Sequence, residues 1–551
     1  MTAGMKQIKW SLIFLFMAMT GLLQAQDEEQ LPGQNLTVIS EIRPVLQEAE
    51  KVRLSPALPR VEHTEPDLEY IFEEKQIEVA YEAPEVRPLA VKAEALEPLP
   101  HAFVKVGFGN VTTPMAEVYL NSGRKQKYRK GKTNSNYGAA FKYISQKSAR
   151  AEQLYSDFRS RLFADFYTDA AYFSPYIGYS RDGNRFYGYD PATDTVLAAL
   201  DNKQVFNYYY GGLKFGNPEE NDAKIDFDGE LRMAALSDYL GQSEINPVLG
   251  LKGSKELDNS HRINAGLRLD YSRLTAFDTL VQTQLIFGFH PSYLIRGDVW
   301  FAELGLRTGS DDHGFFLYPD LRFERQLMEE SLVFSAAIRG QSLKNNFKTL
   351  SDENPYLQAG QTITSSRNLE VGAGLSGVPF RNFSYRVEGS YTNRRFMPYF
   401  MNDTLLPNRF NVIYDTATSI VKLHAELGYE LSKKMHFLAS GDFYKYSTSE
   451  QFKPWYKPSM KFSLLLQYYV IESLRIEASV NAFSKMWARD DARAVIRLPG
   501  LVDINLGADY KINESFHIFV HVNNLSSVKY QRWYRYPGYG INGVGGIKMI
   551  F

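Results

Sequence analysis

The chain has 551 residues, a formal net charge of -1 and no cysteine. The absence of cysteine excludes disulfides, thiolate metal sites and a lipid-modified amino-terminal cysteine. Aromatic residues make up 14% of the chain, yet the mean hydropathy is only -0.33. Membrane β-barrels combine these two values, because their strands alternate lipid-facing with water-facing residues and their rims are rich in aromatic side chains.

The amino-terminus has the features of a secretory signal peptide. Lys6 and Lys9 precede an apolar run from Trp10 to Leu23, and acidic residues begin shortly after Ala25. The apolar run is too short to span a bilayer comfortably, and a small residue at the end of such a run fits a cleavage site. We therefore expect residues 1–25 to direct export and to be removed after Ala25.

Residues 26–100 form an acidic segment that is rich in proline. They hold nine of the 24 prolines and a net charge of -10, which leaves +7 on residues 101–551 once the +2 of the signal region is counted. Proline removes backbone donors and favours extended geometry in the residue before it. We therefore expect an extended segment that lies in the periplasm or fills a lumen, and no folded domain.

From His101 the hydrophobic period becomes two and stays so. Between Lys224 and Met233, for example, charged residues alternate with apolar residues and one glycine. A charged face repeated this often needs a wet interior, and an apolar face repeated this often needs lipid or a second sheet. The pattern predicts an all-β fold, a transmembrane antiparallel β-barrel of about 22 strands over residues 101–551, with 20 or 24 strands also compatible. Tight turns alternate with long loops, which we place at 182–202, 344–362, 395–415, 486–499 and 524–540.

No catalytic, cofactor or metal constellation stands out. His517 and His521 share one face of a strand, but roughly 13 Å of strand separates them, which is too far to chelate one metal. No phosphate-binding glycine loop and no nucleic-acid motif is present, so we expect no enzyme, no cofactor and no nucleic-acid partner. Asp311 and Asp312 precede a histidine in a loop, and they suit either a divalent cation or simple solvation.

An aromatic and basic run lies near the end of the chain at Trp533, Tyr534 and Arg535. Such residues suit a contact with a sugar or a peptide at the outer face. They also suit a girdle at the membrane interface, which uses the same residue types. The sequence leaves both interpretations open.

The final strand stops on an aromatic carboxy-terminus. Ile547, Met549 and Phe551 share one face of this strand. Outer-membrane barrels close on such a strand and are recognised by it during insertion. We therefore interpret these three residues as an insertion signal.

A motif precedes that strand and carries a resemblance to a known family. In order along the chain it consists of Asn523, Asn524, Leu525, Tyr530, Tyr536, Pro537 and Gly538. Together with the strand that ends at Phe551, it resembles the carboxy-terminal end of TonB-dependent receptors, the 22-stranded transporters of the outer membrane. The resemblance implies a barrel in the outer membrane, uptake of a solute and contact with the periplasmic protein TonB.

The other end of the chain departs from the family. TonB-dependent receptors place a folded plug domain between signal peptide and barrel, whereas residues 26–100 are short and broken by proline. Near the start of that segment, Leu36, Thr37, Val38, Ile39 and Ser40 are similar to the short box with which the family contacts TonB. Without a plug, the usual energised uptake is in doubt.

Two functional hypotheses follow. In the first, the barrel takes up a solute that the sequence does not identify, and its lumen is filled by the outer loops or by the acidic segment drawn into a basic barrel. In the second, the barrel is a scaffold or subunit of an envelope complex, and residues 26–100 dock a periplasmic partner. The expected partners in either case are outer-membrane lipid, the barrel-assembly machinery during insertion, and TonB or another periplasmic protein.

Overall fold

The structure of the protein is a computed structural model. It describes residues 100–122, 134–148, 150, 152–168, 170–217, 224–277, 279–329, 331–432 and 434–551. The signal peptide, residues 26–99 of the acidic segment and the TonB-like box at Leu36–Ser40 lie outside the described residues.

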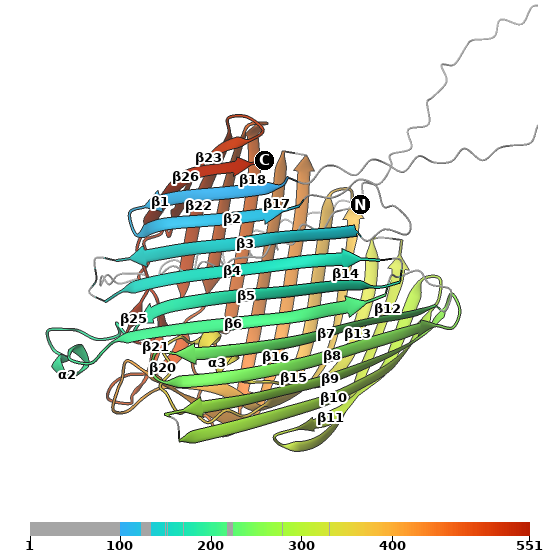
Figure 1. Cartoon of the computed structure of the whole chain (residues 1–551), viewed down its shortest axis with the longest axis horizontal. Coiled ribbons are helices and arrows are strands. Elements are labelled where there is room, and N and C mark those ends of the chain that lie inside the picture. Colours follow the sequence, from blue (N-terminus) through green and yellow to red (C-terminus); the bar gives the residue numbers. More distant parts are fainter. Residues whose placement is uncertain are drawn as a thin grey trace, which may run out of the picture. The chain divides into compact units, whose positions relative to one another are not determined.

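Twenty-two antiparallel strands form one sheet that closes on itself (Figure 1). Closure occurs between the first and the last of them, where Phe103 lies opposite Ile550 and Gly107 opposite Gly546. The fold prediction is thereby confirmed in class and in strand number. The strands of the wall are β1 (Ala102–Gly109), β2 (Thr112–Asn121), β3 (Asn134–Lys147), β4 (Leu154–Tyr167), β5 (Tyr172–Arg185), β6 (Lys203–Gly216), β7 (Ile225–Asp238), β8 (Gln242–Glu256), β9 (His261–Ala276), β10 (Leu280–Arg296), β11 (Trp300–Asp311), β12 (Gly314–Met328), β13 (Leu332–Leu343), β14 (Ser366–Phe380), β15 (Phe383–Asn402), β16 (Phe410–Ser432), β17 (Met435–Thr448), β18 (Met460–Ile471), β19 (Leu474–Phe483), β22 (Leu501–Lys511), β23 (Phe516–Asn523) and β26 (Asn542–Ile550).

Alternation along each strand separates a lipid-facing side from a lumenal side. In β7, Leu231 is 54% exposed on the outer face, whereas its neighbours Glu230 and Arg232 point inward and are less exposed. In β22, Leu506 is 45% exposed outward and Asp509 is 9% exposed inward. Such a wall buries its apolar face only when hydrocarbon surrounds it.

Ion pairs between neighbouring strands line the lumenal side. The carboxylate of Asp509 accepts from Arg475 at 2.7 Å and also from Lys548, so that it links β19, β22 and β26. The carboxylate of Asp442 contacts Lys422 at 3.3 Å and His424 at 3.0 Å across β16 and β17. Cross-strand pairs of opposite charge satisfy each other on a wet surface, which the period of two requires.

Connections between strands differ at the two rims. The rim that carries Phe551 has short turns, such as Arg381–Asn382 between β14 and β15. The opposite rim carries every long loop of the described chain. Two loops at this opposite rim contain the helices α2 (Thr195–Ala198) and α3 (Phe347–Glu353). No helix among the described residues is long and apolar enough to cross a bilayer.

Three of the expected loops contain more strand than the sequence suggests. The predicted loop 395–415 shrinks to 403–409, because β15 and β16 continue as a hairpin beyond the neighbouring strands. The predicted loops 486–499 and 524–540 contain small two-stranded sheets. These sheets pair β20 (Met486–Arg489) with β21 (Val495–Leu498), and β24 (Gln531–Trp533) with β25 (Tyr536–Pro537).

We predict that Leu231→Arg destabilises the barrel by about 2 to 4 kcal/mol, because it places a charge in the middle of the hydrocarbon-facing surface. The matched control is Asp228→Arg in the same strand, on the lumenal face. Urea unfolding in lipid vesicles measures both. Equal losses for the two variants would contradict the assignment of the two faces.

Candidate functional site

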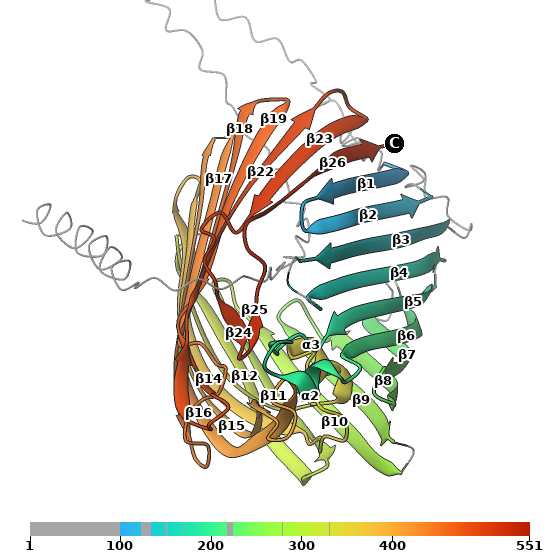
Figure 2. The same ribbon diagram turned by 90° about the vertical axis from the view of Figure 1, so that its left-hand side faces the viewer.

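Loops of the long-loop rim pack together into one structure, which we call the loop cap. It comprises residues 186–202, 344–365, 403–409, 449–459, 484–500 and 524–541. The ends of β15 and β16 at the long-loop rim also belong to it. Figure 2 shows α3, β24 and β25 between opposite sides of the barrel wall. The buried residues that these loops and strand ends contribute to a single hydrophobic cluster include Phe186, Tyr187, Phe347, Leu350, Tyr356, Leu357, Ile363, Met397, Tyr399, Phe400, Phe410, Trp455, Tyr456, Trp533 and Tyr536.

A stack of tyrosines lies at the centre of the cap. The ring of Tyr536 stacks on Tyr356 with 3.6 Å between centroids, and Tyr187 meets Tyr536 edge-on at 5.0 Å. The Tyr536 hydroxyl donates to the carbonyl of Asn408, so four loops meet at one fully buried side chain. Burial raises the pKa of the Tyr536 phenol well above its ordinary value, which keeps it neutral and a donor.

A second aromatic group adjoins the first. The ring centroid of Trp533 lies 4.9 Å from that of Tyr456, 5.4 Å from that of Phe410 and 5.2 Å from that of Phe400. Backbone bonds connect the same loops, since the amide of Phe410 donates to the Tyr356 carbonyl at 2.9 Å. Offset and edge-on aromatic pairs of this kind each add about 0.5 to 1.5 kcal/mol beyond burial, so the cap is a small core of its own.

The carboxy-terminal motif holds the last loop of the cap in place. Asn524 begins that loop with a φ of 52°, a left-handed conformation that asparagine tolerates. Its side-chain amide donates to the Tyr539 carbonyl at 2.9 Å, and Asn523 donates to Asn542 at 3.1 Å. The Pro537 carbonyl accepts from Gln153 and from Tyr187, each at 3.0 Å.

The remaining motif residues divide between the cap and its surface. Tyr530 is 1% exposed and meets Phe483 edge-on, and the Gly538 amide donates to the Tyr530 carbonyl at 3.1 Å. Leu525 is 40% exposed. The motif thus has a structural role here, and its link to the family stays a prediction.

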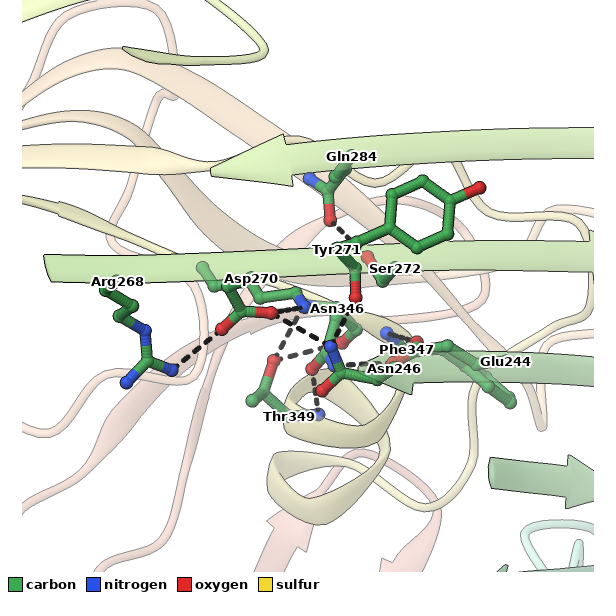
Figure 3. A network of polar contacts seen from close by, with 11 residues as sticks. Glu244, Asn246, Arg268, Asp270, Tyr271, Ser272, Gln284, Asn346, Phe347 and Thr349 are labelled. Atoms are coloured by element: carbon green, nitrogen blue, oxygen red, sulfur yellow. Dashed lines mark hydrogen bonds and ion pairs between the residues drawn. The ribbon is translucent and has the colours of Figure 1, made fainter. Parts of the chain in front are cut away.

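Buried carboxylates anchor the loop of α3 to the barrel wall (Figure 3). Glu244 of β8 accepts from the Phe347 amide at 2.6 Å and from the Asn346 side chain, at the first turn of the helix. Asn346 also caps that helix, with its side chain accepting from the Thr349 amide at 3.0 Å.

A second anchor lies beside the first. Asp270 of β9 accepts from Lys344, from Arg268 at 2.7 Å and from Asn246 at 2.9 Å. A buried carboxylate is tolerated only when its lone pairs are occupied by donors. These contacts therefore hold Lys344, the first residue of the loop, against the barrel wall. Asp270 and Lys344 also line a cavity of about 930 Å³, together with Arg307 and His290.

Arg535 joins three loops at the outer surface of the cap. Its guanidinium contacts Asp491 at 2.9 and 2.6 Å and Asp194 at 2.8 Å. Burial alone would raise the pKa of Asp194, but hydrogen bonds from the Asp190 amide and Arg535 hold it below the ordinary value. Arg535 therefore links its own loop to two others through ion pairs.

A partly buried ion pair joins the end of α3 to the 449–459 loop. Lys457 Nζ lies 2.6 Å from a carboxylate oxygen of Glu353 at the end of α3. Arg532 of β24 and Arg394 of β15 also act on the Glu353 charge. Burial by itself would raise the pKa of Glu353, but Lys457 and the two arginines hold it below its usual range.

The structure places Trp533 inside the cap and not on an exposed outer face. This side chain is 3% exposed and belongs to the core of the cap, because its loop folds inward. Tyr534 is partly exposed, and its hydroxyl is 3.5 Å from Asp491.

The other residues singled out from the sequence also make defined contacts. Asp311 is held by Arg367 at 2.9 Å, and Asp312 accepts from the Ser365 amide at 2.8 Å. No group of three metal-ligating side chains occurs among the described residues. Ile547 and Phe551 lie exposed on the outer face with Met549 between them, and Phe551 meets Phe516 edge-on. Their role in insertion stays a prediction.

Sequence reasoning missed the wall anchors and the ion pair of Lys457 with Glu353, whose members are far apart in the chain. One local signal was available. The loop after β13 carries Phe347, Leu350, Tyr356 and Leu357, which is too apolar for a loop in water.

No family model matches the sequence, and no curated protein is similar to it in sequence. Solved structures are similar in fold. The siderophore receptor PirA from Acinetobacter baumannii has 10% identity and a TM-score of 0.63, over 82% of this chain and 80% of the receptor. A mutant of the ferric enterobactin receptor PfeA from Pseudomonas aeruginosa has 11% identity and a TM-score of 0.60, over 83% of this chain and 80% of the receptor. The matched chain of the FpvAI–pyocin S2 complex has 11% identity and a TM-score of 0.61, over 82% of this chain and 73% of that chain. The chain therefore has the barrel fold of TonB-dependent siderophore receptors.

We predict that Tyr536→Ala loosens the cap and leaves the wall intact, because the cavity removes about 3 to 5 kcal/mol from a small core. Limited proteolysis of the cap loops, together with the heat-modifiable gel mobility of the folded barrel, measures the two effects. Tyr209→Ala is the matched control, since Tyr209 is 55% exposed on the outer face of β6. Unchanged protease resistance in the Tyr536 variant would contradict the account of the cap.

Proposed function

We propose that the chain is an outer-membrane receptor that binds a solute at its loop cap and takes it up through the barrel. One observation carries the proposal. Six loops fold into a packed core over a charged lumen, inside a barrel whose outer face suits hydrocarbon. A wide pore that is closed by its own loops must open for a chosen solute, which is the behaviour of a receptor rather than of a general porin.

The similar structures support this proposal by analogy. PirA is a siderophore receptor, and PfeA is a receptor for ferric enterobactin. At about a tenth identity in sequence, their ligands do not transfer to this chain. What transfers into the proposal is the class of function: recognition at the loop rim and passage inward. We propose no enzymatic step.

The environment and the partners belong to the same proposal. The barrel would lie in outer-membrane lipid after insertion by the assembly machinery, which would read Ile547, Met549 and Phe551. Leu36–Ser40 would contact TonB. The acidic segment 26–100, with its net charge of -10, would enter or cover a barrel region of +7 by charge complementarity.

Conductance in planar bilayers tests whether the cap closes the lumen. We expect the full-length protein to conduct poorly, because loops and wall pack together. Replacing residues 346–363 by a short Gly-Ser linker removes α3 and should produce large, stable openings. If the shortened variant conducts no more than the full-length protein, the cap does not close a solute path.

A separate deletion of residues 26–98 reports on the acidic segment. Increased conductance in that variant would assign part of the closure to the segment, and unchanged conductance would assign closure to the cap alone.

Solute binding discriminates uptake from the scaffold alternative. Native mass spectrometry of the purified protein, after incubation with the low-molecular-weight fraction of spent growth medium, should reveal a retained solute. Tyr536→Ala should weaken its retention. Retention of no small molecule, together with a stoichiometric protein bound through residues 26–100, would favour a scaffold instead.

A further inference from the structure

We propose that a groove on the hydrocarbon-facing side of the wall holds an acyl chain of a lipid whose phosphate headgroup carries a net negative charge. The groove has a volume of about 1020 Å³ and is lined by residues of β11–β17. The side chains that point outward into it are apolar or aromatic, and they include Leu304, Val371 and Tyr391. The inference goes beyond the proposed function, because a lipid held here would lie outside the lumen.

Three small residues form the floor of the groove. Ala373 of β14 lies between Ala336 of β13 and Gly389 of β15, opposite both of them. A β-carbon added to Gly389 would lie more than 4 Å from every atom beyond its own chain neighbours, so the space over it is open. Residues that lie opposite each other across a sheet point to the same face, so these three leave one continuous depression.

Large apolar side chains border the floor at both ends of the same row. Phe323 of β12 lies opposite Ala336, and Leu423 of β16 lies opposite Gly389, with Phe443 of β17 beyond it. Leu423 is 51% exposed and Phe443 is 47% exposed, so both stand out from the wall. In hydrocarbon, a void beside such side chains forfeits dispersion contacts. A flexible acyl chain can follow the depression and restore them.

The groove meets polar residues towards the long-loop rim. Val421 of β16 lines it there, and Lys445 of β17 lies directly opposite Val421 on the same outer face. Tyr391 of β15 also lines it, with its hydroxyl oxygen 3.0 Å from that of Ser419. Tyrosine and lysine on a lipid-facing surface mark the level where hydrocarbon gives way to headgroups. The groove therefore reaches the interface of the leaflet at that rim.

Two exposed cations between the groove and the long-loop rim favour an anionic headgroup. Lys445 is one, and Arg395 is the other, roughly 13 Å beyond Tyr391 along β15. Neither forms an ion pair with another residue that the structure describes. Anionic lipid phosphate is the complementary charge at this depth of a membrane. An apolar groove with cations at its outer end thus matches an anionic phospholipid, whose phosphate lies on the same side of its acyl chains.

Native mass spectrometry of the full-length protein tests the site. The protein is reconstituted in vesicles of equal parts phosphatidylglycerol and phosphatidylcholine with identical acyl chains, and is then extracted in a mild detergent. We expect a single lipid to stay bound to each barrel, and phosphatidylglycerol to be preferred by about tenfold. Added sodium phosphate should not displace it, because free phosphate lacks the acyl chain.

Two substitutions separate the acyl chain from the headgroup. Gly389→Leu fills the floor and should abolish retention of either lipid. Lys445→Gln should keep a bound lipid but lower the preference for phosphatidylglycerol by about fivefold. The matched controls lie on the outer face of β8, where Gly253 is opposite the exposed Phe227. Gly253→Leu and Lys255→Gln should both leave retention and preference unchanged.

Several results would overturn the proposal. Equal retention in the Gly389 and Gly253 variants would mean only the general lipid shell of a barrel. Equal retention of the two lipids, or displacement by sodium phosphate, would remove the match of headgroup and chain. A protein dimer that Gly389→Leu disrupts, with no lipid retained, would assign the groove to a second copy of the chain. Gel mobility confirms that each variant is folded, and Ala373→Leu fills the same floor if Gly389→Leu does not fold.

Discussion

The width of a 22-stranded barrel is the constraint on which the rest of the structure depends. Side chains of the wall cannot meet across a lumen of that circumference, so the barrel encloses space that something else must fill. In the described chain, loops from one rim fill it. They form a core of their own, and the stack of Tyr356 on Tyr536 lies at its centre.

The cap combines two kinds of interaction that suit different surroundings. Aromatic packing holds the loops to one another, whereas carboxylates hold them to a wall that must stay polar. Glu244 and Asp270 show why this works, because a strand turns every second side chain inward and the loop supplies the matching donors at Phe347 and Lys344. The lumen is thus closed without an apolar wall.

The sequence predicts the wall well and the cap poorly, for a physical reason. Leu506 and Asp509 reveal their faces through a period of two, which is local, so strand number and alternation follow from short windows. The contact of Tyr187 with Tyr536 joins residues that no local period relates. The place of Trp533 in a predicted loop suggests a surface residue, because loops are usually exposed. Instead, its loop folds inward and the side chain packs in the core of the cap.

The central claim is that the outer loops form a stable core that closes the barrel. Hydrogen–deuterium exchange on the purified full-length protein tests it most directly, because exchange reports the local free energy of opening. The account predicts that amides of residues 356–363 and 530–539 exchange as slowly as those of the wall strands. Exchange of these amides within seconds, while the wall stays protected, would contradict it.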